Sequence, residues 1–302
     1  MKSWQILVRG MAMGAADMVP GISGGTIAFI TGIYTRLIHS LSQLGPELLF
    51  TAKRQGIHAA WQRLDGHFLF TLLAGILISV LLLANLISWL LLHYPMHLQG
   101  FFLGMVAGSA LLIARQISDW QLTRLLALGG GMLLASAVTH FLPSLHELSL
   151  ISFFIGGAIA ICAMILPGIS GSFLLLIMGL YAPVLEAVRS FQLNYLAALA
   201  LGCGFGLLFF SRLLRWLLDQ HRQLTFAVLL GFVIASMRHL WPWQLLKRYR
   251  LSEDMQVIPL ETHLLLPWHY VDIFPGAHHW LSIVFLFLLG WFLVLRMAPK
   301  HL

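Results

Sequence analysis

A short motif of proline, glycine and serine occurs twice in an otherwise apolar chain. Pro20-Gly21-Ile22-Ser23-Gly24 is matched by Pro167-Gly168-Ile169-Ser170-Gly171, and each copy is followed at the same spacing by Gly-x-Tyr. Pro and Gly free backbone groups from helical hydrogen bonds, which within lipid is tolerated only where protein or a water-filled cavity satisfies them. A helix that restarts at the serine directs N–H groups and its positive dipole end into the break. Two such breaks favour binding of an anion, most naturally a phosphate.

One carboxylate accompanies the first motif. Asp17 is the only formal charge between Arg9 and Arg36, and its counterpart in the second motif is the apolar Met164. A carboxylate within a membrane is costly, so it is a functional candidate whose usual role is proton or sodium coupling. The alternative is that Asp17 caps N–H groups that the break releases.

The composition indicates which elements carry these motifs. The 302 residues are 59% hydrophobic and 10% charged, with a mean hydropathy of +0.87, which fits no soluble class. Only two cysteines are present, both within apolar runs, which excludes a disulfide scaffold and a thiolate metal site. Nearly all histidines lie in loops or at helix ends, so we expect no metal site and no cofactor. The sequence predicts an all-α polytopic integral membrane protein.

Uncharged runs long enough for spanning helices of roughly 20 residues define the layout. The spans are expected at about 67–92, 98–115, 123–142, 194–217, 221–240 and 280–297. Two further stretches, 3–44 and 148–190, are apolar but interrupted by Pro and Gly near their middles.

The repeated motif indicates a duplication of the whole layout. A weaker match of 103–109 to 230–236 supports it, and a basic linker at 46–65 is present only in the first half. Each half is then a re-entrant helical hairpin plus three transmembrane helices, an odd number of crossings, so the second half must be inverted. We expect one membrane domain, 1–302, with repeat one at 1–145 and repeat two at 146–302. Inverted repeats with paired Gly/Pro-interrupted segments are typical of secondary transporters, whereas the alternative is glycines that only allow close helix packing.

The positive charges predict the orientation. With a cytoplasmic N-terminus, most of the 18 Lys and Arg residues fall on the cytoplasmic side, which also receives the C-terminus and 46–65. Residues 241–278 are expected outside. The net charge of +7 is explained by this topology and indicates no nucleic-acid partner. Arg238, at the outer end of a span, either reaches to the lipid headgroups or meets an anionic headgroup at the mouth of the site.

Three segments together resemble a bacterial family of polyprenyl-phosphate (undecaprenyl-phosphate) translocases, formerly a domain of unknown function. Met13 to Thr26 with Gly32-Ile33-Tyr34 resembles its first motif, Leu166 to Ser172 its second, and Gly231 through Trp243 its third. The resemblance implies a flippase in the bacterial cytoplasmic (inner) membrane that returns undecaprenyl phosphate from the outer to the cytoplasmic leaflet. This lipid carries precursors of peptidoglycan and other cell-envelope polymers, so the protein would be a transporter and not an enzyme.

The same resemblance implies the site residues. Asp17 would couple transport to a proton or sodium gradient, and Arg238 would contact the headgroup on the outer side. The phosphate would be bound by backbone and hydroxyl groups of two sets of residues, Gly21, Ser23, Gly24, Gly25 and Thr26 in the first motif and Gly168, Ser170, Gly171 and Ser172 in the second.

Two rival functions use the same residues. Gly21 to Gly24 matches the Gly-x-Ser-Gly of rhomboid-type intramembrane proteases, but no histidine is placed near mid-span to activate the serine. A small-anion channel or exchanger would use the same broken-helix dipoles. A lateral opening to lipid would separate this alternative from a lipid transporter.

Overall fold

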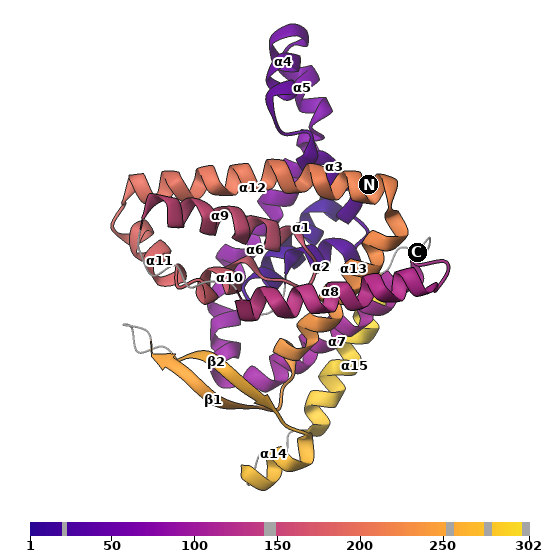
Figure 1. Cartoon of the computed structure of the whole chain (residues 1–302), viewed down its shortest axis with the longest axis vertical. Helices are drawn as coiled ribbons and strands as arrows, with labels where there is room; N and C mark the ends of the chain where they lie inside the picture. The colour runs from indigo at the N-terminus through magenta and orange to yellow at the C-terminus, as the bar shows by residue number, and fades with distance from the viewer. Residues whose placement is uncertain (20–22, 142–148, 252–256, 275–279, 298–302) are drawn as a thin grey trace.

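The chain folds almost entirely into helices, packed into one body from which one pair projects (Figure 1). This computed structural model describes residues 1–19, 23–141, 149–251, 257–274 and 280–297. Pro20, Gly21 and Ile22, and with them the predicted role of Gly21, lie outside the described residues. The first half contains α1 (Ser3–Asp17), α2 (Gly24–Ile30), α3 (Tyr34–Ser42), α4 (Pro46–Gln55), α5 (Ile57–Arg63), α6 (Gly66–His93), α7 (Pro95–Arg115) and α8 (Leu122–Phe141).

The second half repeats this order of elements and adds a small hairpin. It contains α9 (Leu150–Ile165), α10 (Gly171–Ile177), α11 (Tyr181–Arg189), α12 (Leu193–Gln220), α13 (Arg222–Ser236), the 3-10 helix η1 (Met237–Leu240), β1 (Gln244–Leu251), β2 (Val257–Leu264), α14 (Pro267–Ile273) and α15 (Trp280–Met297).

Among the described residues, five segments are long and apolar enough to cross a membrane: α6, α7, α12, α13 with η1, and α15. Shorter apolar stretches are Leu122–Val138 within α8, and α9. Large apolar side chains such as Leu81, Leu133 and Leu201 are exposed on the outer faces of these helices, as expected where the surrounding medium is lipid. These features confirm the all-α polytopic membrane fold.

The first interrupted stretch returns to the side from which it came. Gly10 of α1 packs against the backbone of Leu72 and Gly75 in α6, and Ser3 Oγ lies 2.9 Å from His67 Nε2. Helices α1 and α6 therefore lie side by side, run in the same direction and start together. The chain between them must make a re-entrant hairpin, as the sequence predicts.

The second interrupted stretch follows the same plan. The Phe153 and Tyr195 rings, near the starts of α9 and α12, have centroids 4.8 Å apart. Further along, Gly206 of α12 packs against Ala158 of α9, so these helices also run in parallel. Between them, α10 and α11 meet at an angle of 104°.

The two halves run in opposite directions. Near the end of α12, Arg212 donates a hydrogen bond to the Leu44 carbonyl at 2.9 Å. Leu44 follows α3, and α3 is tied to the start of α6 by the 2.6 Å ion pair between Arg36 and Asp65. Helix α12 thus ends on the side where its counterpart α6 begins, which confirms that the repeats are inverted.

The last helix of each half packs on the middle span of the other half. Gly104 of α7 fits against the Phe287 carbonyl of α15, and its equivalent Gly231 of α13 fits against the Leu128 carbonyl of α8. A Cβ at either glycine would lie within 2.3 Å of the facing oxygen. Glycines that allow close helix packing are therefore also present at positions outside the repeated motif.

Two structured segments were missed by the sequence analysis. The basic linker 46–65 is mostly the helical pair α4–α5, and 244–264 contains the antiparallel pair β1–β2, with Gln244 opposite Leu264. Pro259 in β2 lacks an N–H and argues against a strand, yet it is tolerated because both strands of a two-stranded sheet are edges.

Candidate functional site

The two breaks meet each other through side chain to backbone hydrogen bonds. Ser23 Oγ donates to the Met164 carbonyl at 3.0 Å, and the Gly168 N–H donates to Thr26 Oγ1 at 3.0 Å. Ser23 and Thr26 are each only 1% exposed. The predicted approach of the two motifs is thus seen for their described residues, with α2 starting directly after Ser23 and α10 directly after Ser170.

The start of α2 has its donors satisfied within the protein. The Gly24 N–H donates to Asp17 Oδ1 at 2.6 Å, the Gly25 N–H to Ser23 Oγ at 3.1 Å, and the Thr26 N–H to the Ser23 carbonyl at 2.9 Å. In this conformation these groups hold the break together. An anion could reach them only if α2 moved.

Asp17 makes the capping contact that the sequence analysis gave as the alternative to coupling. Its Oδ1 accepts from Gly24, while its buried Oδ2 has no hydrogen-bond partner within the described residues. The carboxylate therefore stabilises the start of α2. Its role in coupling stays a prediction.

Glycine is required where the two breaks touch. A Cβ on Gly25 would lie 2.7 Å from the Ile165 carbonyl oxygen. Gly168 has a φ of +91°, in the left-handed region that favours glycine, and a Cβ there would lie 2.9 Å from the Phe232 carbonyl oxygen. These two contacts explain the glycine at position 168 of the second motif and the glycine at position 25, directly after the first.

The start of α10 differs, because its donors are open. No side chain caps it, and the N–H groups of Gly171, Ser172 and Phe173 have no hydrogen-bond partner among the described residues. The Ser170 and Ser172 hydroxyls lie 2.9 Å apart, and Ser172 is exposed. This edge of the second break can donate several hydrogen bonds to an anion.

A cation lies on the neighbouring turn. The Phe173 ring contacts the His239 ring at 5.1 Å, which places η1 beside the first turn of α10. Arg238 on the same turn is exposed, and its guanidinium forms no ion pair within the described part of the chain. His239 was missed by the sequence analysis, although its position next to Arg238 was a usable signal.

The turn that carries Arg238 is held by the segment leading to the hairpin. Trp241 Nε1 donates to the Leu265 carbonyl at 2.8 Å, and Gln244 Nε2 donates to the Trp241 carbonyl at 2.7 Å. The Trp241 and Trp243 rings also contact each other. The base of the β1–β2 hairpin is therefore hydrogen-bonded to the turn formed by η1.

The glycine of each Gly-x-Tyr sequence ends its short helix in the same way. Gly32 and Gly179 have φ values of +72° and +75°. Ile33 donates its N–H to the Ala28 carbonyl, and Leu180 donates to the Leu175 carbonyl, which is the Schellman arrangement that glycine permits. The second half of each repeated motif is therefore structural.

The serine hydroxyls have partners unlike those of a protease nucleophile. Ser23 Oγ bonds to the Met164 carbonyl and the Gly25 amide, and Ser170 Oγ bonds to Ser172. A nucleophilic serine needs a base such as histidine within hydrogen-bonding reach. Both hydroxyls instead make structural contacts or face an open polar edge.

Comparisons with known proteins agree with this geometry. A family model described as undecaprenyl phosphate translocase-like matches residues 13–258. The chain is 44% identical to a polyprenyl-phosphate transporter of Vibrio cholerae over 288 residues, covering 95% of this chain and 94% of that protein. It is 31% identical to a polyprenyl-phosphate transporter of Staphylococcus aureus over 257 residues, covering 79% and 86%. No solved structure matches.

Both relatives and the family are named for transport and not for an enzymatic reaction. Because the family model covers most of the chain and the relatives match nearly all of it, this protein belongs to the undecaprenyl phosphate translocase-like family.

Proposed function

We propose that this protein carries polyprenyl phosphate across the membrane, returning undecaprenyl phosphate from the outer to the cytoplasmic leaflet. The observation that carries this proposal is the second break, where backbone N–H groups next to the exposed Ser172 have no hydrogen-bond partner, and the nearby Arg238 no ion pair, among the described residues. Ser170, Gly171, Ser172 and Arg238 would bind the phosphate. The identity of the transported lipid is inferred from the fold and from the names of the relatives.

The groups of the first break would join the site only after a conformational change. Ser23 and Thr26, with the N–H groups of Gly24, Gly25 and Gly168, are bonded within the protein. Separation of α2 from α9 would release them toward a phosphate. Exchange of the headgroup between the breaks is the natural way for inverted repeats to alternate access.

An apolar cavity beside the first break favours a lipid over a small anion. It has a volume of about 400 Å³ and lies between α1, α2, α6, α7 and α15. Its walls include Ala16, next to Asp17, and Ile27, Phe102 and Leu293, the last of which is exposed. A chloride-like ion gains nothing from such a cavity, whereas a hydrocarbon tail is stabilised by it. The cavity argues against the channel or exchanger alternative.

The distribution of charges supports the proposed orientation in the bacterial inner membrane. The side where α6 starts and α12 ends carries Arg36, Arg63, Arg212 and Arg215, and the positive-inside rule makes this side cytoplasmic. Both termini would then be cytoplasmic and the β1–β2 hairpin external. We further propose the repeat boundary between residues 145 and 146, in a stretch outside the described residues.

Lipid binding tests the proposed substrate. Purified protein is titrated with undecaprenyl phosphate and analysed by native mass spectrometry, with Arg238→Gln beside Arg189→Gln, an exposed arginine at the end of α11. Loss of a hydrogen bond to a charged group costs about 1.5–3 kcal/mol, so Arg238→Gln should weaken binding at least about tenfold. Arg189→Gln should bind like wild type. Equal affinities in all three proteins, or no adduct in wild type, would contradict the proposal.

Single-cysteine labelling tests the topology. Cysteines are placed at Gln55, the last residue of α4, and at His269 in α14, both exposed, in a chain whose Cys162 and Cys203 are replaced by Ala. A membrane-impermeant reagent should label His269→Cys in intact cells and Gln55→Cys only after permeabilisation. Labelling of both from the same side would overturn the layout.

A further inference from the structure

The helical pair α4–α5 projects from the body of the protein and belongs to the first half only (Figure 1). In the second half, α11 ends at Arg189 and α12 begins at Leu193, which leaves no room for a counterpart. The pair is therefore an addition to the duplicated core, and neither break uses it.

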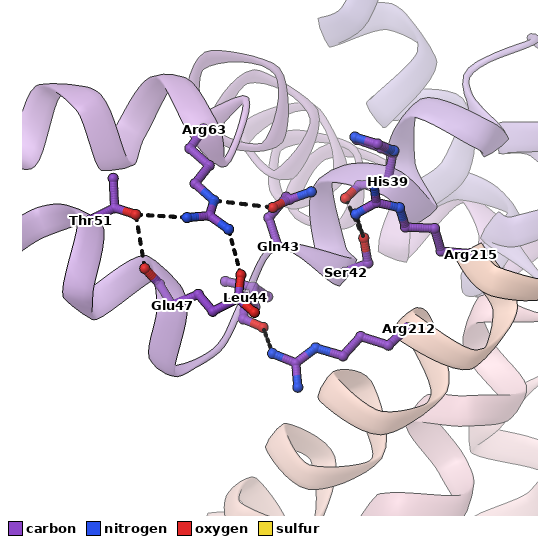
Figure 2. A network of polar contacts seen from close by, with 9 residues as sticks. All are labelled: His39, Ser42, Gln43, Leu44, Glu47, Thr51, Arg63, Arg212 and Arg215. Atoms are coloured by element: carbon purple, nitrogen blue, oxygen red, sulfur yellow. Dashed lines mark hydrogen bonds and ion pairs between the residues drawn. The ribbon is translucent and has the colours of Figure 1, made fainter. Parts of the chain in front are cut away.

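A polar network fixes the pair to the core (Figure 2). Arg63 of α5 donates to Glu47 at 2.5 Å and to Thr51 at 2.8 Å, both in α4. At the base of the pair, Arg212 of α12 bonds the Leu44 carbonyl and Arg215 bonds Ser42 Oγ. The two helices are thus held to each other and to a spanning helix.

Large apolar side chains are exposed on both helices of this pair. Leu49 is 67% exposed, Phe50 62% and Ile57 82%. Lys53 and Arg54 lie one helical turn after Leu49 and Phe50 and are also exposed. Apolar residues beside Lys and Arg on a short helix are typical of a segment that lies in a membrane interface. Exposure of these apolar side chains to water would be unfavourable.

The position of the pair along α12 matches the depth of that interface. It attaches at Arg212, while α12 begins at Leu193 and continues to Gln220. About 20 residues span the hydrocarbon core, so Arg212 lies near its boundary. In Figure 1 the pair extends across the direction of α12, so it would lie along the membrane surface.

We propose that α4–α5 is an interfacial anchor that lies in the membrane around the protein, on the side where α6 begins. Leu49, Phe50 and Ile57 enter the boundary between headgroups and acyl chains. Lys53 and Arg54 contact anionic phospholipid headgroups, whose negative charge they complement. The pair therefore contacts the anionic lipids of one leaflet. It does not contact the lipid that the protein transports.

Fluorophore quenching tests the anchor without measuring transport. An environment-sensitive dye is attached to Phe50→Cys or Ile57→Cys in the cysteine-free full chain, reconstituted in vesicles of phosphatidylglycerol and phosphatidylethanolamine. Gln62→Cys is the control, since Gln62 pairs with His58 on a polar face of α5. Dye at 50 and 57 should be quenched by spin-labelled lipid, and dye at 62 by iodide. Iodide quenching at all three positions would overturn the anchor.

The charge contribution is tested on the same labelled protein. Replacing phosphatidylglycerol by phosphatidylcholine should lower the ratio of lipid-buried to solvent-exposed dye at position 57 by up to about thirtyfold, because each of the two basic residues near an anionic surface is worth about 1 kcal/mol, a factor of about five. In Lys53→Gln/Arg54→Gln the two vesicle compositions should give the same quenching. Full dependence on phosphatidylglycerol in this double variant would overturn the assignment of Lys53 and Arg54.

Discussion

The two Pro-Gly-Ile-Ser-Gly copies are nearly identical in sequence but differ in their hydrogen bonding. At the first copy, Asp17 and Ser23 satisfy the N–H groups at the start of α2. At the second copy, Met164 replaces the aspartate and is 40% exposed, and the start of α10 has no side-chain cap. The residues next to the motif, Asp17 against Met164 and Gly25 against Ser172, therefore distinguish a closed break from an open one.

This difference indicates a division of labour between the repeats. The first break is joined to the second by the hydrogen bonds of Ser23 and Thr26, which hold the second break in place. The second exposes Ser172 beside the turn that carries Arg238. A duplicated motif supplies two backbones of the same shape, and the residues around each copy decide whether its donors face the protein or a ligand.

The largest loss of stability is expected from a substitution where the two breaks are in contact. Gly25→Ala places a Cβ 2.7 Å from the Ile165 carbonyl oxygen, so α2 and α9 must separate at a cost of about 3 kcal/mol, the upper end for overpacking. Gly204→Ala in α12 is the matched control, because its Cβ would meet nothing within 4 Å. Thermal unfolding in detergent should show a lower midpoint for Gly25→Ala alone. Equal midpoints would mean that the breaks are not packed as described.

The next effect concerns the hydrogen bond between the breaks. Thr26→Val keeps the shape of the side chain but leaves the buried Gly168 N–H without its acceptor, at a cost of about 1–3 kcal/mol. Thr26→Ser retains the hydroxyl and should recover most of the stability. Both variants are compared with wild type by thermal unfolding. If Thr26→Val were as stable as Thr26→Ser, the hydrogen bond from Gly168 to Thr26 would not hold the two breaks together.

The sequence was sufficient to predict five of the six spans, the re-entrant hairpins and the inversion, because these depend on apolar length, Pro/Gly breaks and parity. It also predicted correctly that a helix begins again directly after Ser23 and after Ser170. It could not predict which donors are occupied, since that depends on contacts between Ser23 and Met164 or Thr26 and Gly168, which are far apart in the chain. His239 was missed for the same reason, because its neighbour Phe173 lies in another element.

A smaller effect is expected for a hydroxyl at the open break. Ser172→Ala removes one exposed hydroxyl, so binding of undecaprenyl phosphate should weaken by about 1.5 kcal/mol, roughly tenfold, with only a small fall in the unfolding midpoint, because Ser170 alone loses a partner. Ser23→Ala should do the reverse, lowering the midpoint because the Met164 carbonyl and the Gly25 N–H lose a partner. Native mass spectrometry and thermal unfolding on the same samples give both values. If Ser23→Ala lowered affinity as Ser172→Ala does, without loss of stability, the two breaks would be equivalent binding sites.

The smallest effect on stability, and the most informative for mechanism, is expected for Asp17→Asn. The asparagine amide oxygen can still accept from the Gly24 N–H, and Asn and Asp are similar caps, so stability should change by less than about 1 kcal/mol. The charge, however, is lost. If the carboxylate binds a proton or sodium ion during transport, the variant should bind lipid and move it passively, but without response to an imposed gradient.

Flux of undecaprenyl phosphate is therefore measured in liposomes with a proton or a sodium gradient, for wild type and Asp17→Asn side by side. Collapsing the gradient with an ionophore provides the passive rate of each protein. Coupling predicts that wild type responds to one of the gradients and that Asp17→Asn runs at its passive rate under all conditions. An identical gradient response in both proteins would leave Asp17 as a cap alone. The asymmetry between the breaks would then serve packing and would not link the lipid to an ion.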